Sequence, residues 1–144
     1  MLSDLKQAHE QLLAGIADLA ELIQQDRPDP ERLAQVRWRL SRASGARRRL
    51  VEQACEQLVA GGGSEVAERL RNLRDTGAEM LSASSRHIGT WTIDQILADW
   101  GGYRLASAMM RKSMRARIDA ERAILYPLLE HGRPGAPRQP RRSA

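Results

Sequence analysis

Apolar residues recur at spacings of three and four along four segments of the chain, which is the period of an amphipathic helix. The first segment covers residues 3–25 and stops at the sequence DRPDP (26–30), because its two prolines cannot continue a helix. In the second segment, Asp29 is expected to act as the N-cap and Pro30 as the first helical residue, and the helix ends at the three glycines 61–63. The pattern therefore predicts two long helices in the first half of the chain.

The third and fourth segments are less regular at their ends. Ser64 is expected to cap the third helix, which loosens near RHIGTW (86–91). The residues TIDQ (92–95) fit a capping box for a short helical turn, and the glycine pair 101–102 is expected to break or kink it. The last helix then covers residues 103–130 and carries a proline near its end, which is expected to loosen the final turns.

Four amphipathic segments joined by short connections, with no strand-like alternation, predict an all-α fold, an antiparallel up-down four-helix bundle. A length of 144 residues corresponds to one domain, and a hydrophobic content of 42% is enough to form a core without disulfides. We expect this domain to cover residues 1–131. Residues 132–144, GRPGAPRQPRRSA, are rich in proline, glycine and arginine and are expected to form a disordered basic tail.

The net charge of +5 narrows the set of partners only when its location is considered. Four arginines and no acid lie in residues 132–144, so the rest of the chain is close to neutral and specific nucleic-acid binding is not expected. The single Cys55 can form neither an internal disulfide nor a thiolate metal site. No apolar run approaches a membrane span and no secretory signal is visible, so we expect a cytoplasmic protein that does not bind membranes.

Three of the apolar stripes contain an ionisable residue where a hydrocarbon core is expected. These residues are His9 in the first helix, Arg47 in the second and Glu121 in the last, with Arg117 one turn before Glu121 and Glu52 near the edge of the Arg47 stripe. Each residue alone has a purely structural explanation. His9 can be a hydrogen-bonded core histidine, Arg47 can reach water from the border of its stripe, and Glu121 can form a surface ion pair with Arg117. Their coincidence on several stripes favours a polar site inside the bundle.

The last helical segment carries a family resemblance. Residues 117–131, RIDAERAILYPLLEH, resemble the last helix of the hemerythrin-like (HHE cation-binding) proteins, in which a histidine is followed four residues later by a glutamate. The matching positions are Ile118, Glu121, Leu125, Tyr126 and Pro127, and further similar segments are ADWGGYRLA (98–106), WRL (38–40) and KQAHEQLL (6–13), which carries His9. The resemblance covers roughly residues 3–131 and is weak in the third helix. It implies a hemerythrin-like four-helix bundle.

Proteins of that family hold a di-iron centre with histidines and bridging carboxylates, and this chain departs from that ligand set. Its histidines are His9, His87 and His131, of which we expect the second in a loop and the third at a helix end. Arg117 stands at the last-helix histidine position, and Arg47, or Arg48 if the register slips by one, stands at that of the second helix. Residues 66–85 contain no histidine. Since arginine offers no lone pair to a metal and repels a cation, the resemblance implies a bundle that has lost its di-iron site and holds no cofactor.

A bundle that loses a dication keeps carboxylates that need positive partners, because an unpaired buried charge is costly. We therefore predict that an arginine pairs with a glutamate inside or at the mouth of the bundle. The candidates are Arg117 or Arg47 with Glu121 or Glu52, and His9 is expected to be hydrogen-bonded nearby. In the third helix, Gly77 is expected to let a neighbouring helix or a long side chain approach closely.

The leading hypothesis is a metal-free hemerythrin-like binding or regulatory module whose polar pocket takes a small anionic ligand. The pocket candidates are His9, Arg47, Glu52, Arg117 and Glu121. One alternative is a reduced, carboxylate-rich mononuclear metal site, in which Glu10 joins His9 and the two glutamates. Another is a helical interaction module with an inert pocket, whose arginine-rich second helix docks an acidic protein partner. No nucleophile–base pair or phosphate-binding loop is present, so an enzyme is not expected, and the oligomeric state is left open.

Overall fold

Helices make up nearly all of the chain that the computed structural model describes, which is residues 1–131. Within this part there are five helices and no strands: α1 (Leu2–Ile23), α2 (Pro30–Gly61), α3 (Ser64–Thr90), α4 (Ile93–Ala98) and α5 (Trp100–His131). The predicted all-α fold is confirmed. The expected disordered tail, residues 132–144, lies outside the described residues.

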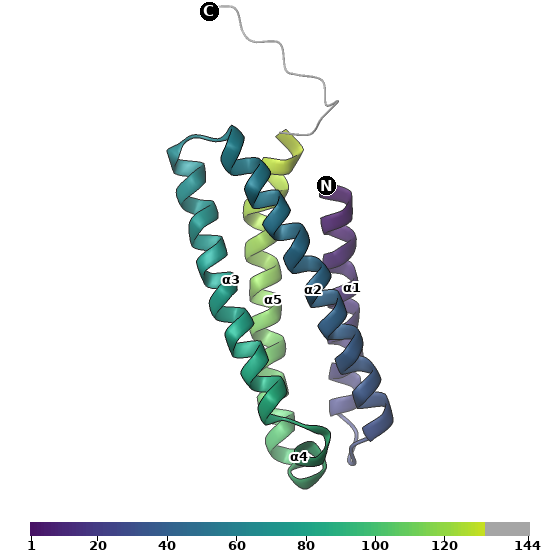
Figure 1. Ribbon diagram of the computed structural model, residues 1–144. Helices are drawn as coiled ribbons and strands as arrows, with labels where there is room; N and C mark the ends of the chain where they lie inside the picture. Colours follow the sequence, from purple (N-terminus) through teal and green to yellow (C-terminus); the bar gives the residue numbers. More distant parts are fainter. Residues whose placement is uncertain (132–144) are drawn as a thin grey trace, which may run out of the picture.

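The four long helices lie side by side, and the short α4 joins α3 to α5 at the lower end of the molecule in Figure 1. Both α1 and α3 pack against α2 and against α5. The N-terminus lies at the same end of the molecule as the last turns of α5 (Figure 1). The inner faces of α1, α2, α3 and α5 therefore meet along the length of the molecule.

The start of α2 forms as the sequence predicts. The Asp29 carboxylate accepts a hydrogen bond from the backbone N–H of Arg32 at 3.2 Å, and Pro30 occupies the first helical turn. The start of α3 differs, because Gly63 is the N-cap residue and Ser64 is already helical, with no side-chain capping bond. The expected capping role of Ser64 is therefore wrong, and the glycine run before α3 supplies the extended backbone of the cap position.

The C-terminal part of α3 continues through most of residues 86–91, where the sequence predicts a loosened chain, so that prediction is wrong. Only Gly89 in this segment is a poor helix former, and one glycine costs a helix about 1 kcal/mol. Aromatic packing offsets that cost, since the rings of Trp91 and His87 lie 5.6 and 6.1 Å from the ring of Tyr103. His87 is consequently a half-buried helical residue rather than a loop residue.

The connection from α4 to α5 breaks earlier than the glycine pair suggests. The backbone N–H of Gln95 donates to Thr92 Oγ1 at 3.2 Å, which confirms the predicted N-cap of the short α4. The break falls at Asp99, whose carboxylate accepts a hydrogen bond from Gly102 N–H at 2.9 Å, and both glycines lie in the first turn of α5. A Cβ atom at Gly102 would collide with that carboxylate, so the glycine makes room for the cap. The helix then continues, with its one proline inside it, to His131.

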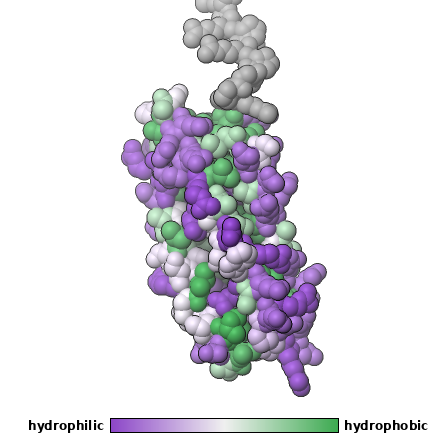
Figure 2. All heavy atoms as spheres, turned by 45° about the vertical axis from the view of Figure 1, so that its right-hand side comes forward, coloured by the Kyte–Doolittle hydropathy of each residue, from purple (hydrophilic) through white to green (hydrophobic). Residues whose placement is uncertain are grey.

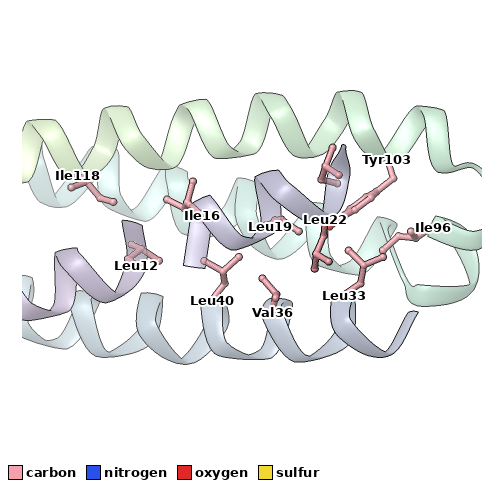
Figure 3. Packing of buried hydrophobic residues seen from close by; sticks show 11 residues of the cluster. Leu12, Ile16, Leu19, Leu22, Leu33, Val36, Leu40, Ile96, Tyr103 and Ile118 are labelled. Atoms are coloured by element: carbon pink, nitrogen blue, oxygen red, sulfur yellow. The ribbon is translucent and has the colours of Figure 1, made fainter. Parts of the chain in front are cut away.

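Two apolar clusters form the core. The first joins parts of α1, α2, α4 and α5 (Figure 3) and contains Leu12, Ile16, Leu19, Leu22, Ile23, Leu33, Val36, Leu40, Ile96, Tyr103 and Ile118. The second lies nearer the N-terminus of α1 and contains Leu5, Val51, Ala54, Cys55, Leu70, Leu73, Leu125 and Leu129. The apolar stripe of α1 is buried at Leu5, Leu12, Ile16, Leu19 and Ile23. Gly15 lets α1 approach α2 closely, because a Cβ atom there would lie 2.8 Å from the Leu40 side chain.

The surface is mostly polar on the face shown in Figure 2, with apolar patches between the hydrophilic side chains. The most exposed large apolar side chains in residues 1–131 are Trp38, Leu105 and Met109. No helix in this part of the chain combines the length and the apolar character that a membrane span requires.

Candidate functional site

On three of the long helices, a charged or polar residue separates the residues of the two apolar clusters. His9 on α1, Arg47 on α2 and Glu121 on α5 each follow a residue of one cluster and precede a residue of the other. All three are buried, with at most 7% of the residue exposed. Arg117, one turn before Glu121, joins them with 10% of its side chain exposed. These four residues are called the polar layer.

Glu121 is the common acceptor of the polar layer. Its Oε1 atom lies 2.8 Å from Nε2 of His9, and its Oε2 atom accepts hydrogen bonds from Arg47 Nη1 at 2.7 Å and from Arg117 Nε at 2.9 Å. Three of the four long helices thus meet at one carboxylate that has no exposed surface. The predicted pairing of buried arginines with Glu121, and the nearby position of His9, are confirmed.

The two ring nitrogens of His9 both have hydrogen-bond partners. Nδ1 lies 2.6 Å from the hydroxyl of Tyr126, and Nε2 faces Glu121. Burial raises the pKa of Tyr126, and the charges of Glu10 and Glu121 add to this while Arg122 opposes it. The Nε2–H tautomer of His9 satisfies both contacts, because Nε2–H then donates to the carboxylate and Nδ1 accepts from the Tyr126 hydroxyl. These bonds explain how an ionisable ring is satisfied in the apolar seam of α1.

The third helix contributes to the layer through a hydroxyl and a glycine. Arg117 Nη1 donates to Thr76 Oγ1 at 2.9 Å, and its Nη2 atom lies only 2.5 Å from where a Cβ atom of Gly77 would be. Gly77 thus leaves the space that the guanidinium occupies. The prediction that this glycine lets a long side chain approach closely is confirmed.

The polar layer carries more positive than negative charge. Burial alone would raise the pKa of Glu121, but the hydrogen bond from His9 and the charges of Arg47 and Arg117 together lower it below its ordinary value. The carboxylate is consequently ionised at neutral pH. Two guanidinium groups then face one carboxylate, and the second positive charge has no acidic partner within the layer.

Glu52 does not belong to this layer, although the sequence pattern includes it among the pocket candidates. Its side chain is 55% exposed and forms an ion pair with Arg74 at 2.5 Å, on the surface between α2 and α3. The reason is helical geometry, since five residues after Arg47 the side chain has turned about 140° around the helix axis. The sequence prediction for Glu52 as a partner of the buried arginines is therefore wrong.

The polar-layer residues do not fit a di-iron centre of the kind that hemerythrin-like proteins hold. Within the described residues, no three His, Cys, Asp or Glu side chains are close enough together to hold a metal ion. Both oxygens of Glu121 already take part in hydrogen bonds, and Arg47 rather than Arg48 is the α2 arginine that contacts this carboxylate. Glu10, the further carboxylate proposed for a mononuclear site, is exposed, and His131 lies exposed at the end of α5.

A separate cavity of about 160 Å³ lies between α2, α3 and α5. Its lining contains arginine and serine side chains together with apolar ones: Leu19, Arg37, Leu40, Ser41, Ser44, Arg48, Leu81, Ser84, Ser85, His87, Ile88, Tyr103, Ser107, Met110, Arg111 and Met114. No acidic side chain is among them. A second hollow of only about 20 Å³, which is the size of a single water, lies between this cavity and the polar layer and touches Arg47 and Arg117.

Three guanidinium groups of this cavity have no ion pair with any described residue. They belong to Arg37, Arg48 and Arg111. Burial lowers the pKa of Arg48 and of Arg111, and neighbouring arginines lower each further. Burial, followed by the charge of Arg37, likewise lowers the pKa of His87. The cavity wall is therefore strongly positive.

Sequence reasoning missed this cavity because it treated the α2 arginines as an outer face. Arg39 and Arg42 do lie outside, where the first pairs with Asp18 at 3.3 Å and the second lies 4.9 Å from the Trp38 ring. One signal was available in the sequence, since serines recur on three different helices, and the structure places Ser41, Ser44, Ser84 and Ser107 in the cavity lining. Small polar residues at core spacing leave space and line it with hydroxyl groups.

Comparison of the chain with protein-family models, with curated proteins and with solved structures gives no match. The function is therefore argued from the polar layer and from the cavity beside it.

Proposed function

We propose that this protein is a metal-free, hemerythrin-like binding or regulatory module built on an antiparallel up-down four-helix bundle, and that it binds a small anionic molecule. The bundle assignment is supported by four long helices whose chain direction reverses at each connection in Figure 1. It is further supported by the polar layer, because His9, Arg47 and Arg117 occupy the positions at which the resemblance implies metal ligands. In this proposal, arginine side chains provide the interior positive charge that a bound metal ion would otherwise provide.

The observation that carries the binding proposal is the positively charged cavity. Arg37, Arg48 and Arg111 line a space without any acidic side chain, although a guanidinium in a partly buried place needs a compensating negative charge. An anion in the cavity supplies that charge. Arginine is suited to hold it, because its planar group donates two parallel hydrogen bonds to a carboxylate or phosphate.

The polar layer and the cavity are connected through one hydroxyl group. Ser44 Oγ accepts a hydrogen bond from Arg47 Nη2 at 3.1 Å and another from Arg48 Nη1 at 3.3 Å. The unbalanced charge of the layer therefore lies next to the cavity and adds to its positive potential. A negative ligand gains from both sets of arginines.

Calorimetric titration with acetate and with inorganic phosphate at low ionic strength tests this function. We expect saturable binding that weakens about tenfold in Arg48→Gln, which is the effect of losing one charged hydrogen bond. Arg39→Gln is the matched control on the same helix, because Arg39 is 57% exposed and lies outside the cavity. Absence of saturable heat with both anions, or equal binding by the two variants, would overturn the proposed function.

A further inference from the structure

We propose that the ligand of this cavity is a one-ring aromatic carboxylate, an inference that rests on the proposed anion-binding function and names the class of molecule. The starting point is size. The cavity volume of about 160 Å³ is close to that of an apolar cavity known to hold one benzene ring, about 150 Å³. A ligand that lies wholly inside this cavity therefore has about the size of one ring with a small substituent.

The charged part of the wall is suited to a single anionic group. Arg111 Nε donates to Ser107 Oγ at 3.4 Å, a long bond that leaves its two terminal nitrogens without a hydrogen-bond partner among the described residues. Arg48 uses only Nη1, toward Ser44. A carboxylate matches the planar fork of either guanidinium, and hydroxyl groups nearby can bond the oxygen lone pairs that remain.

The apolar part of the wall is suited to a flat ring. Met110 and Met114 on α5 face the cavity together with Ile88 of α3 and Leu40 of α2. Methionine sulfur makes favourable contacts with aromatic rings, and its unbranched chain adapts to their shape. A rigid ring also loses less conformational entropy on binding than an acyl chain of the same volume.

One end of the cavity is lined by the rings of Tyr103 and His87. Tyr103 is 1% exposed, and His87 stacks on it with a centroid distance of 6.1 Å. Arg37 lies 6.0 Å from the Tyr103 ring centroid. A ring that enters between the methionines and this end meets apolar and aromatic atoms, while its carboxylate stays with the arginines.

Calorimetric titration of the full chain with four probes tests the inference: benzoate, acetate, benzyl alcohol and phenyl phosphate. We expect benzoate to bind at least about tenfold more tightly than acetate, which lacks the ring, and than benzyl alcohol, which lacks the charge. Arg111→Gln should weaken benzoate binding about tenfold, while the matched control Arg104→Gln, on the exposed side of α5, should leave it within about twofold. Ser84→Phe, which fills the cavity, should abolish benzoate binding in a variant whose circular dichroism remains helical.

The outcomes separate this inference from the proposed function. If acetate and benzoate bind equally tightly and both depend on Arg111, the anion site stands and the aromatic assignment is overturned. If phenyl phosphate binds more than about tenfold more tightly than benzoate, the carboxylate assignment is overturned. If benzyl alcohol binds as tightly as benzoate, and neither Arg48→Gln nor Arg111→Gln changes binding, both the inference and the proposed function are wrong.

Discussion

Glu121 accepts all the ionic hydrogen bonds of the polar layer. Its removal is therefore expected to destabilise the fold more than removal of any other side chain of the layer. Arg47 and Arg117 share its Oε2 atom, while His9 contacts Oε1. If one arginine is removed, Glu121 still has a cationic partner and the layer becomes electrically balanced. If Glu121 is removed, two buried guanidinium groups lose their only carboxylate. Such clusters are weak contributors to stability as a whole, but breaking them is costly.

We predict that Glu121→Gln lowers the free energy of unfolding by about 3 kcal/mol or more, whereas Arg117→Ala lowers it by about 1.5–3 kcal/mol. The double variant should recover part of the summed loss, because the two residues interact directly. Urea denaturation measures these differences. Arg39→Ala is the control and should change the free energy of unfolding by no more than about 0.5 kcal/mol, as expected for an exposed pair. Equal effects of Arg117→Ala and Arg39→Ala would contradict the role of the polar layer.

The lowered pKa of Glu121 gives the layer a defined pH dependence. In the unfolded chain a glutamate titrates at about pH 4.3. The stabilising contribution of Glu121 is therefore fully present above that pH and is lost as the pH falls through the lower pKa of the folded state. We predict that the difference in free energy of unfolding between the parent and Glu121→Gln shrinks as the pH falls below about pH 4. Urea titrations at several pH values test this. A difference that grows on acidification would show the opposite sign of the pKa shift.

Single helices were easier to predict than the contacts between them. The stripe of α1 and the cap of α2 follow from apolar spacing and from local chemistry that involves neighbouring residues only. The continuation of α3 past Arg86 depends on packing against Tyr103, which belongs to a distant segment. Glu52 points outward because of its angle around α2. Apolar spacings of three and four residues do not fix that angle for a residue at the border of the buried face.

The space beside Gly77 provides a prediction at the level of the helix. Replacing glycine by alanine inside a helix ordinarily raises stability by about 0.5–1 kcal/mol. At Gly77 the new Cβ would lie 2.5 Å from Arg117 Nη2, whose guanidinium is held by Glu121 and Thr76, so we predict that Gly77→Ala gives no stabilisation or a loss.

Gly89 on the same helix is the matched control, because nothing lies within 4 Å of a Cβ atom there. Gly89→Ala should raise the thermal midpoint, and Gly77→Ala should do so only when Arg117 is also replaced by alanine. Equal stabilisation by both single substitutions would show that Arg117 moves freely and that Gly77 has no special role.

At the scale of the whole molecule, the described residues 1–131 form two apolar clusters with a charged layer between them and a cavity beside that layer. The sequence allowed prediction of the all-α fold and of four residues of the layer, because a charge inside an apolar stripe is visible without coordinates. The cavity was not predictable, since its volume depends on how far apart α2, α3 and α5 lie at their facing serines. Which arginines turn inward likewise depends on that spacing.

The central proposal is that arginine side chains lie where a hemerythrin-like centre would hold metal, and iron stoichiometry tests it most directly. Protein purified without chelators and then equilibrated anaerobically with excess ferrous iron should be analysed for bound metal after removal of the free ion, together with its optical spectrum after exposure to air. We predict no stoichiometric iron and no oxo-bridge charge-transfer bands, because Arg47 and Arg117 are fixed positive charges at the implied ligand positions. Tight binding of one or two irons per chain would contradict the claim.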